Sequence, residues 1–286
     1  MLAAEYPDVT LWAIPLFAAT IGIEIWIVQR WRRTGGRVVR GYAARDTWAS
    51  LAMGLGSVFF VFFINLAVFA IAVVLWPFRL WDLGNGWAGW VVALVGWDLL
   101  YYWHHRFEHQ IRLLWACHVN HHSSEYFNLS TALRQPWTPW ASIFFYPLLA
   151  LVGVAPWMIM VSGGINLIYQ YWVHTEAIDR LPRAIEAVWN TPSHHRVHHG
   201  SNPEYIDRNY AGILIVWDRA FGTFEPERAH VQYGLTKNID TYNPLRIAFD
   251  EYAALWRDVL QASRWQDGLK LLWRGPYWEP TPRSPG

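Results

Sequence analysis

The stretch LAMGLGSVFFVFFINLAVFAIAVVLWPF, from Leu51 to Phe78, decides the fold of this chain. It carries no charged residue, and Asn65 is its only strongly polar side chain. An α-helix rises about 1.5 Å per residue, so about 20 apolar residues cross a hydrocarbon layer roughly 30 Å thick. The stretch exceeds that length, which favours a membrane span over the buried helix of a soluble protein.

Three further apolar stretches predict additional membrane-embedded helices. Val9–Gln29 contains Glu24 as its only charge, and basic residues follow it, an order that suits a membrane anchor better than a cleaved signal peptide. Trp87–Trp103 is shorter. Ala141–Val173 has Pro156 in its middle, so we interpret it as two passes or as one re-entrant hairpin that turns there. We therefore expect an all-α integral membrane protein with four to five membrane-embedded helices.

The composition supports a membrane protein and narrows the range of possible binding partners. The chain is 53% hydrophobic and 16% charged, whereas soluble domains carry roughly a quarter charged residues. Its 21 tryptophans suit the membrane–water interface, and its net charge of +1 gives no field that would attract nucleic acid. Cys117 is the only cysteine, which excludes an internal disulfide and a thiolate metal site.

Arginine predicts which way the helices cross, because short cytoplasmic loops are enriched in basic residues. The loop after the first span is rich in arginine, and we place it in the cytoplasm: Arg30, Arg32, Arg33, Arg37, Arg40 and Arg45. Counting spans from this loop returns the chain to the cytoplasm at His104 and again at His174. The histidine-rich segments are therefore expected on the cytoplasmic side of a multi-pass protein.

Eleven of the twelve histidines lie between His104 and His199, and most fall into three motifs. These are His105-Arg-Phe-Glu-His109, His118-Val-Asn-His121-His122 and His195-Arg-Val-His198-His199, with His174 alone at the end of the last apolar stretch. Residues three and four apart share one face of a helix, so each motif directs two or three imidazoles toward one point.

Nine clustered imidazoles exceed the needs of one metal, because a tetrahedral zinc site uses at most four ligands. Imidazole suits iron, zinc and copper alike, but a site among lipid chains calls for C–H oxidation, which iron with O₂ performs and zinc does not. We therefore predict two iron ions per chain. The predicted ligands are His105, His109, His118, His121, His122, His174, His195, His198 and His199. All of them except His174 are also predicted catalytic residues.

Two histidines beside the motifs stay open. His194 lies four residues before His198 and is a possible tenth ligand, whereas His104 points about 100° away from its neighbour on a helix. His230 lies outside the motifs and is expected at the surface.

A ligating imidazole needs its other ring nitrogen held by a carboxylate, carbonyl or water. Asp98 leads the carboxylates, since a charge near the bilayer interior is costly without a partner, and Glu176 follows His174 closely. Tyr102 and Asn128 are further candidates beside the site. Solvated surface charge remains the alternative for the carboxylates, and interfacial aromatic packing the alternative for the tyrosine.

The chain becomes polar and proline-rich from about Asp179. We expect residues 1–178 to form a transmembrane stem that carries the first two motifs, and residues 179–286 to form a cytoplasmic cap that carries the third, as one functional unit. Within the cap, residues 245–260 predict an amphipathic helix that lies on the membrane surface or packs on the cap. Its apolar face would contain Leu245, Phe249, Tyr252, Trp256 and Val259.

With these motifs in hand, residues 45–250 resemble the fatty acid hydroxylase / sterol desaturase superfamily, whose pattern is H-x3-4-H, H-x2-H-H and H-x2-H-H. Within it, the chain is most similar to the alkylglycerol monooxygenase branch. The matching stretches are His121–Glu125, Asn128–Gln135, Trp172–Glu176, Asn190–Gly200, Asn209–Gly212 and Trp217–Phe224.

The resemblance implies an O₂-dependent non-haem di-iron monooxygenase that hydroxylates a lipid alkyl or acyl chain, with the carbon beside an ether oxygen as one candidate position. No cytochrome or ferredoxin motif is visible, so a separate electron donor is expected, and the animal members use tetrahydrobiopterin. Gln110 stands where animal members have Glu, which leaves donor and substrate open. Gln170 stands where some members have His, which implies one ligand fewer and places Gln170 beside the site.

Other functions fit parts of the pattern. A lipid or sterol desaturase would use the same site, and an oxygenase fold without turnover would have a structural role. A zinc-dependent membrane hydrolase is disfavoured because no H-E-x-x-H motif is visible. A metal transporter or sensor is disfavoured because the histidines lie at span ends and no repeat is visible. The sequence leaves the oligomeric state open.

Overall fold

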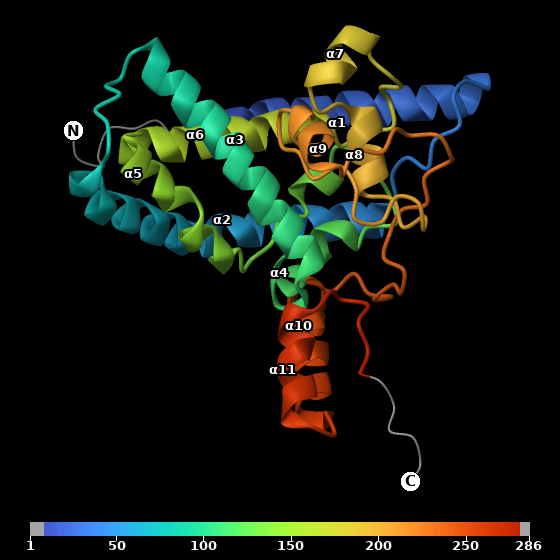
Figure 1. The fold of residues 1–286 in the computed structure, drawn as a ribbon. Helices are drawn as coiled ribbons and strands as arrows, with labels where there is room; N and C mark the ends of the chain where they lie inside the picture. Colours follow the sequence, from blue (N-terminus) through green and yellow to red (C-terminus); the bar gives the residue numbers. More distant parts are fainter. Residues whose placement is uncertain (1–8, 281–286) are drawn as a thin grey trace.

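The computed structural model describes residues 9–280, which form helices, turns and two isolated β-bridges without an extended strand. The expected helical class is therefore confirmed for this part of the chain. Figure 1 shows a stem of long helices, with the loop-rich segments gathered at one end of it. The long stem helices are α1 (Val9–Thr34), α2 (Ala44–Leu75), α3 (Trp87–Gln110) and α6 (Pro156–Trp172).

Helix α6 is the centre of the stem, because it packs against α1, α2 and α3. Two described helices, Trp12–Thr34 and Ala44–Phe78, are long and apolar enough to cross a membrane. Much of the apolar surface of α2 faces outward, including Leu55, Phe59 and Phe62. A large exposed apolar surface of this kind is typical of a membrane-facing helix or an interaction surface. The expected total of four to five embedded helices stays a prediction.

The apolar stretch Ala141–Val173 folds as one broken hairpin. Its first arm consists of short turns of 3-10 helix followed by α5 (Leu149–Val152), and its second arm is α6. The first arm, Trp140–Val152, reaches about 26 Å at most, even at the roughly 2.0 Å rise of a 3-10 helix, too short to cross a bilayer. Of the two alternatives from the sequence, the structure therefore favours the hairpin over two complete passes.

The hairpin turns at Gly153, whose φ of +106° lies in the left-handed region. A Cβ atom there would lie 2.3 Å from the main-chain oxygen of Trp81, so close approach as well as conformation requires glycine. Pro156 then begins α6, where the missing N–H costs nothing.

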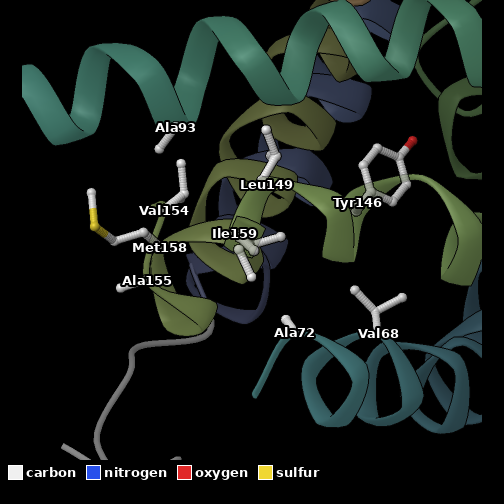
Figure 2. Packing of buried hydrophobic residues seen from close by; sticks show 10 residues of the cluster. Val68, Ala72, Ala93, Tyr146, Leu149, Val154, Ala155, Met158 and Ile159 are labelled. Atoms are coloured by element: carbon white, nitrogen blue, oxygen red, sulfur yellow. The ribbon is translucent and has the colours of Figure 1, made fainter. Parts of the chain in front are cut away.

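A buried apolar core joins the hairpin to the stem (Figure 2). Val68 and Ala72 from α2 face Leu149 and Ile159 of the hairpin, and Ala93 of α3 covers the other side. This core fixes α3 against α2 and α6, and α3 then carries the first histidine motif out of the stem.

The remaining helices are short and lie at the histidine-bearing end of the stem, except for a hairpin that extends away from it (Figure 1). Helix α4 (Arg112–His122) follows α3 directly. The short helices are α7 (Arg183–Val188), α8 (Pro192–His198) and α9 (Val216–Phe221), and the extended hairpin is α10 (Pro244–Gln261) with α11 (Trp265–Trp273). The amphipathic helix expected at 245–260 is confirmed as α10. The stem–cap boundary near residue 179 stays a prediction.

Candidate metal centre

All nine clustered histidines are buried at the end of the stem, none more than 7% exposed. Helix α3 supplies His105 and His109, and helix α4 supplies His118, His121 and His122. His174 is the second residue after α6. Helix α8 supplies His195 and His198, and His199 is its C-terminal cap. Four segments that are distant in the sequence therefore supply one compact site.

The nine imidazoles divide into two groups, and within each group the potential ligand atoms lie within 4.8 Å of one another. The first group contains His105, His109, His118, His122 and His198. The second group contains His121, His174, His195 and His199. Five and four nitrogens could thus hold one ion each.

Each H-x2-H-H motif contributes to both groups, a division that the sequence analysis did not anticipate. On α4, His118 and His122 are four residues apart and join the first group, while His121 turns to the second. On α8 the pattern reverses, since His195 and His199 join the second group and His198 the first. Helical periodicity explains this, because positions i and i+4 lie on nearly the same face of a helix. Position i+3 is rotated about 60° from position i.

The spacing of the ring nitrogens fits ligands of a common ion. In the first group, His118 Nε2 lies 3.0 Å from His105 Nε2 and 3.1 Å from His122 Nε2. In the second, successive Nε2 atoms of His121, His174, His195 and His199 are 3.1, 2.9 and 3.2 Å apart. Nitrogens bound at about 2.0–2.1 Å and roughly at right angles around an ion would be about 3 Å apart.

The protonation of these imidazoles suits metal binding as well. Burial lowers the pKa of His105 to about 3 and that of His121 to about 4, and the pKa values of the other seven also lie below the usual value. The rings are therefore neutral near pH 7 and keep a free lone pair. Nε2 of His109 and of His198 is buried with no hydrogen-bond partner, which is costly unless a ligand is bound there.

Main-chain carbonyls, not carboxylates, orient four of the rings. The Nδ1 atoms of His105, His121, His174 and His198 lie 2.8, 3.3, 2.7 and 3.1 Å from the main-chain oxygens of Tyr210, Arg134, Gln170 and Arg208. Since a carbonyl only accepts, each Nδ1 carries the proton and each Nε2 presents its lone pair to the group.

Glu108 is the carboxylate closest to the site among the described hydrogen bonds and ion pairs. Its oxygens lie 3.6 Å from Nδ1 of His118 and 3.6 Å from Nε2 of His104. The side chain is 6% exposed, and burial raises its pKa to about 8. Glu108 therefore links a histidine of the first group to His104, whose Nδ1 lies 3.1 Å from the Tyr146 hydroxyl.

Asp98, the leading support residue from the sequence, contacts no clustered histidine in the described structure. It accepts hydrogen bonds from Asn166, Trp217 and the main-chain N–H groups of Ile213 and Leu214. These contacts anchor the loop that carries Tyr210, so Asp98 lies one step further from the metal centre than expected. Seven residues separate it from His105, about 10 Å along α3, which explains why it does not reach the ring.

The other expected support residues behave similarly. Gln170 contacts His174 only through its main-chain oxygen. Tyr102 bonds Thr223, Asn128 donates to the Gly41 carbonyl, and Glu176 accepts from the Arg40 N–H, so these three tie surrounding segments together.

The histidines left open by the sequence lie outside both groups. His194 faces away, with Nδ1 3.3 Å from the Thr191 hydroxyl and Nε2 3.9 Å from Glu186, so a tenth ligand is not supported. His104 contacts Tyr146 and Glu108, as described above. His230 is exposed, as expected.

Arg134 and Tyr210 also orient clustered histidines, and the sequence did not predict this role for either. Arg134 is 1% exposed and pairs with Asp46 at 2.5 Å, which holds its carbonyl beside His121. Its place in the segment Asn128–Gln135 was the available signal. Tyr210 contributes only a main-chain oxygen, for which the sequence gives no side-chain signal.

A small cavity of about 30 Å³ reaches both histidine groups from the side of the C-terminal segment. Its walls include His109, His122, His198 and His199 together with Asp207 and Tyr277. A space of that size holds one or two water-sized molecules. A small reactant could therefore reach the point where the two groups meet.

Comparison with known proteins gives consistent relatives. Residues 90–223 match the Fatty acid hydroxylase family. The chain is 42% identical over 280 residues to alkylglycerol monooxygenase from Danio rerio and 38% identical over 286 residues to the Homo sapiens protein, covering 96% of this chain and 61% of each relative. Lathosterol oxidase from Mus musculus is 28% identical over 160 residues, covering 50% of this chain and 48% of that protein.

The chain thus spans about three fifths of the length of these two alkylglycerol monooxygenases. No solved structure is a significant match to it.

Proposed function

Residues 90–223 of this chain belong to the fatty acid hydroxylase family, and on that basis we propose that the protein is an O₂-dependent di-iron oxygenase that hydroxylates a lipid chain in the membrane. The observation that carries the proposal is the division of nine buried histidines into two groups with ligand-like spacing. Two groups favour two ions, and membrane-facing helices beside them favour a lipid substrate.

Iron bound in both groups would supply the redox chemistry that couples O₂ to a C–H bond: R–H + O₂ + 2e⁻ + 2H⁺ gives R–OH + H₂O. The protein would orient the ligands through the carbonyls of Tyr210, Arg134, Gln170 and Arg208. Glu108 and His104 would hold or pass a proton behind His118. The 30 Å³ cavity would admit O₂ or water without admitting a lipid chain.

The substrate class follows from the relatives and from the position of the site. The first histidine motif lies where α3 leaves the stem, so the lipid would enter from the stem side, opposite the small cavity. Alkylglycerol monooxygenase is the name of the relatives that cover most of this chain, and we therefore propose an ether-linked alkyl chain as the first substrate class to test. The electrons would come from a separate donor.

The proposed topology is multi-pass with the histidine groups on the cytoplasmic side. It rests on the two long apolar helices and on the arginine-rich segment between them. That segment lies beside the histidine-bearing segments, since Arg40 contacts Glu176, two residues after His174, and Glu125, three residues after His122.

The decisive experiment combines elemental analysis with isotope labelling of purified protein in detergent. We expect about two irons per chain, and ¹⁸O from ¹⁸O₂ in the product formed from an alkylglycerol lipid. His122→Ala should lower the iron content to about one per chain and abolish ¹⁸O incorporation, while His230→Ala, outside both groups, should change neither.

Three other results would contradict the proposal. Zinc alone with O₂-independent turnover would indicate a hydrolase. A new double bond with no ¹⁸O in the lipid would indicate desaturation, the alternative outcome at the same site. Two irons without O₂ consumption on any lipid tested would indicate a structural role.

A further inference from the structure

One face of α10 presents large apolar side chains to the outside of the protein. This face, the α10 stripe, consists of Leu245, Phe249, Trp256 and Leu260, and Leu260 is 82% exposed. Spacings of four, seven and four residues keep the four on one side of the helix. The following helix, α11, also exposes Trp265 and Trp273. A soluble surface would not favour so many exposed tryptophans, whereas a membrane interface does.

The opposite face of α10 is charged and already has its partner in the protein. Glu251 accepts a hydrogen bond from Arg112 Nε at 2.9 Å, and Asp258 lies 2.7 Å from Arg112 Nη2. Arg112 begins α4, the helix that carries the second histidine motif. The charged face of α10 therefore packs on the metal-bearing segment, and the α10 stripe points the other way.

The place where α10 joins the stem corresponds to the edge of a bilayer. Ile247 and Ala248 pack on Ala49 and Met53 of α2. Twenty residues counted back from Leu75, the end of α2, reach Leu55, which is about 30 Å of helix. Ala49 and Met53 follow within about 3–9 Å of that point, so α10 joins α2 at the depth of the lipid headgroups.

The α10 stripe is continuous with the membrane-facing surface of α2. The Phe249 ring lies 6.1 Å from the Trp137 ring, and Trp137 stacks on Phe60 of α2 at 5.0 Å. Phe60 adjoins the exposed Phe59 on the same apolar helix. Figure 1 shows that α10 and α11 run across the direction of α1 and α2, as helices lying in a membrane plane would.

From these relationships we propose that α10 lies flat in the membrane interface, with the α10 stripe inserted among lipids of the leaflet nearest the metal centre. Its partner is the lipid surface itself, reached by burial of apolar side chains. Charge contributes little, since Pro244–Arg274 carries five basic and four acidic residues, a net +1. The inference rests on the proposed membrane span of α2 but not on the proposed chemistry.

Site-directed labelling of the full chain in phosphatidylcholine vesicles tests this directly. An environment-sensitive fluorophore is attached at Leu260→Cys, and quenching is measured with spin-labelled lipids and with aqueous iodide. The matched control is Gln261→Cys, the exposed neighbour about 100° around the same helix. Unmodified protein checks that the buried Cys117 takes up no label.

We expect the Leu260 label to be quenched by lipid carrying its spin label near the headgroup, and to be at least about threefold less sensitive to iodide than the Gln261 label. Equal iodide quenching at both positions would overturn the proposal. Protection of the Leu260 label from both quenchers would also overturn it, because a protein contact would then cover the stripe. Trp256→Cys serves as a second stripe position if Leu260→Cys does not fold.

A label at Leu66→Cys, exposed near the middle of α2, separates this inference from the proposed span. It should be quenched by lipid labelled near the chain end. If lipid does not quench the Leu66 label, α2 does not cross the bilayer, and the span and the inference are overturned together. If lipid quenches the Leu66 label but not the Leu260 label, the inference alone is overturned. The far-UV circular dichroism spectrum of each variant, compared with that of the unmodified protein, checks that the labelled proteins are folded.

Discussion

The main-chain oxygen of Tyr210 lies 2.8 Å from Nδ1 of His105, and this contact joins a loop far along the chain to the first histidine group. Two buried carboxylates hold the loop in place. Asp218 accepts from the N–H groups of Tyr210 and Ala211, and Asp98 accepts from those of Ile213 and Leu214. The orientation of the His105 ring on α3 thus depends on residues that do not touch it.

Asp98→Ala should therefore lower metal occupancy, although Asp98 contacts no histidine. The change leaves two main-chain N–H groups without acceptors, at about 1–3 kcal/mol each, and frees the Tyr210 loop. We expect iron content to fall from unmodified protein to Asp98→Asn to Asp98→Ala, measured by elemental analysis. Asp250→Asn, at an exposed pair with Arg246, is the matched control and should have no effect. Full iron content in Asp98→Ala would show that the loop does not depend on this anchor.

The two H-x2-H-H motifs provide a test of the two-group arrangement on a single helix. His118→Ala removes a ligand from the first group and His121→Ala removes one from the second, although the residues are neighbours on α4. Each variant should retain about one of the two irons. The Mössbauer spectra of the two variants should differ, because the remaining iron would lie in a different histidine group in each. His230→Ala should keep both irons. Identical spectra from the two α4 variants would indicate that the groups do not bind ions separately.

The sequence predicted which histidines lie together because helical spacing is local information. Residues such as His105 and His109 share a helix face whatever the rest of the fold does, so their convergence could be inferred from the motif alone. The assignment of His121 to a different group from His118 could not be inferred, because it depends on where α8 and His174 approach α4.

The partners of the ligands were harder to predict for a different reason. Carboxylates are recognisable in a sequence, but Tyr210, Arg208 and Arg134 contribute main-chain oxygens that every residue has. Only the folded loops select which carbonyl meets a ring. Asp98 was recognised as a buried charge that needs partners, and its partners proved to be main-chain amides rather than imidazole.

Glu108→Gln should weaken metal binding in the first group without unfolding the protein. The glutamate is buried 3.6 Å from Nδ1 of His118, and residues that support a ligand from behind typically contribute 10–100-fold to metal affinity. We expect a loss of about that size in a competition assay with a chelator, confined to the iron that His118→Ala also removes. Glu125→Gln, at a half-exposed pair with Arg40, should bind as the unmodified protein does. An unchanged affinity in Glu108→Gln would exclude a supporting role.

The re-entrant hairpin provides a stability prediction that is independent of the metals. Gly153 and Gly84 both have positive φ, +106° and +59°, but only Gly153 is crowded. Gly84→Ala should cost about 1 kcal/mol from backbone strain alone, since nothing lies within 4 Å of the new Cβ. Gly153→Ala adds a clash with the Trp81 carbonyl, 2.3 Å away, and should cost about 2–4 kcal/mol, because the turn must shift.

Thermal unfolding in detergent measures this difference. The melting temperature should fall from unmodified protein to Gly84→Ala to Gly153→Ala. The folded fraction of Gly153→Ala should still bind iron, since Gly153 precedes α6 and His174 follows the far end of this 17-residue helix, about 25 Å away. Equal melting temperatures for the two variants would show that the hairpin turn tolerates a side chain and is not held against Trp81.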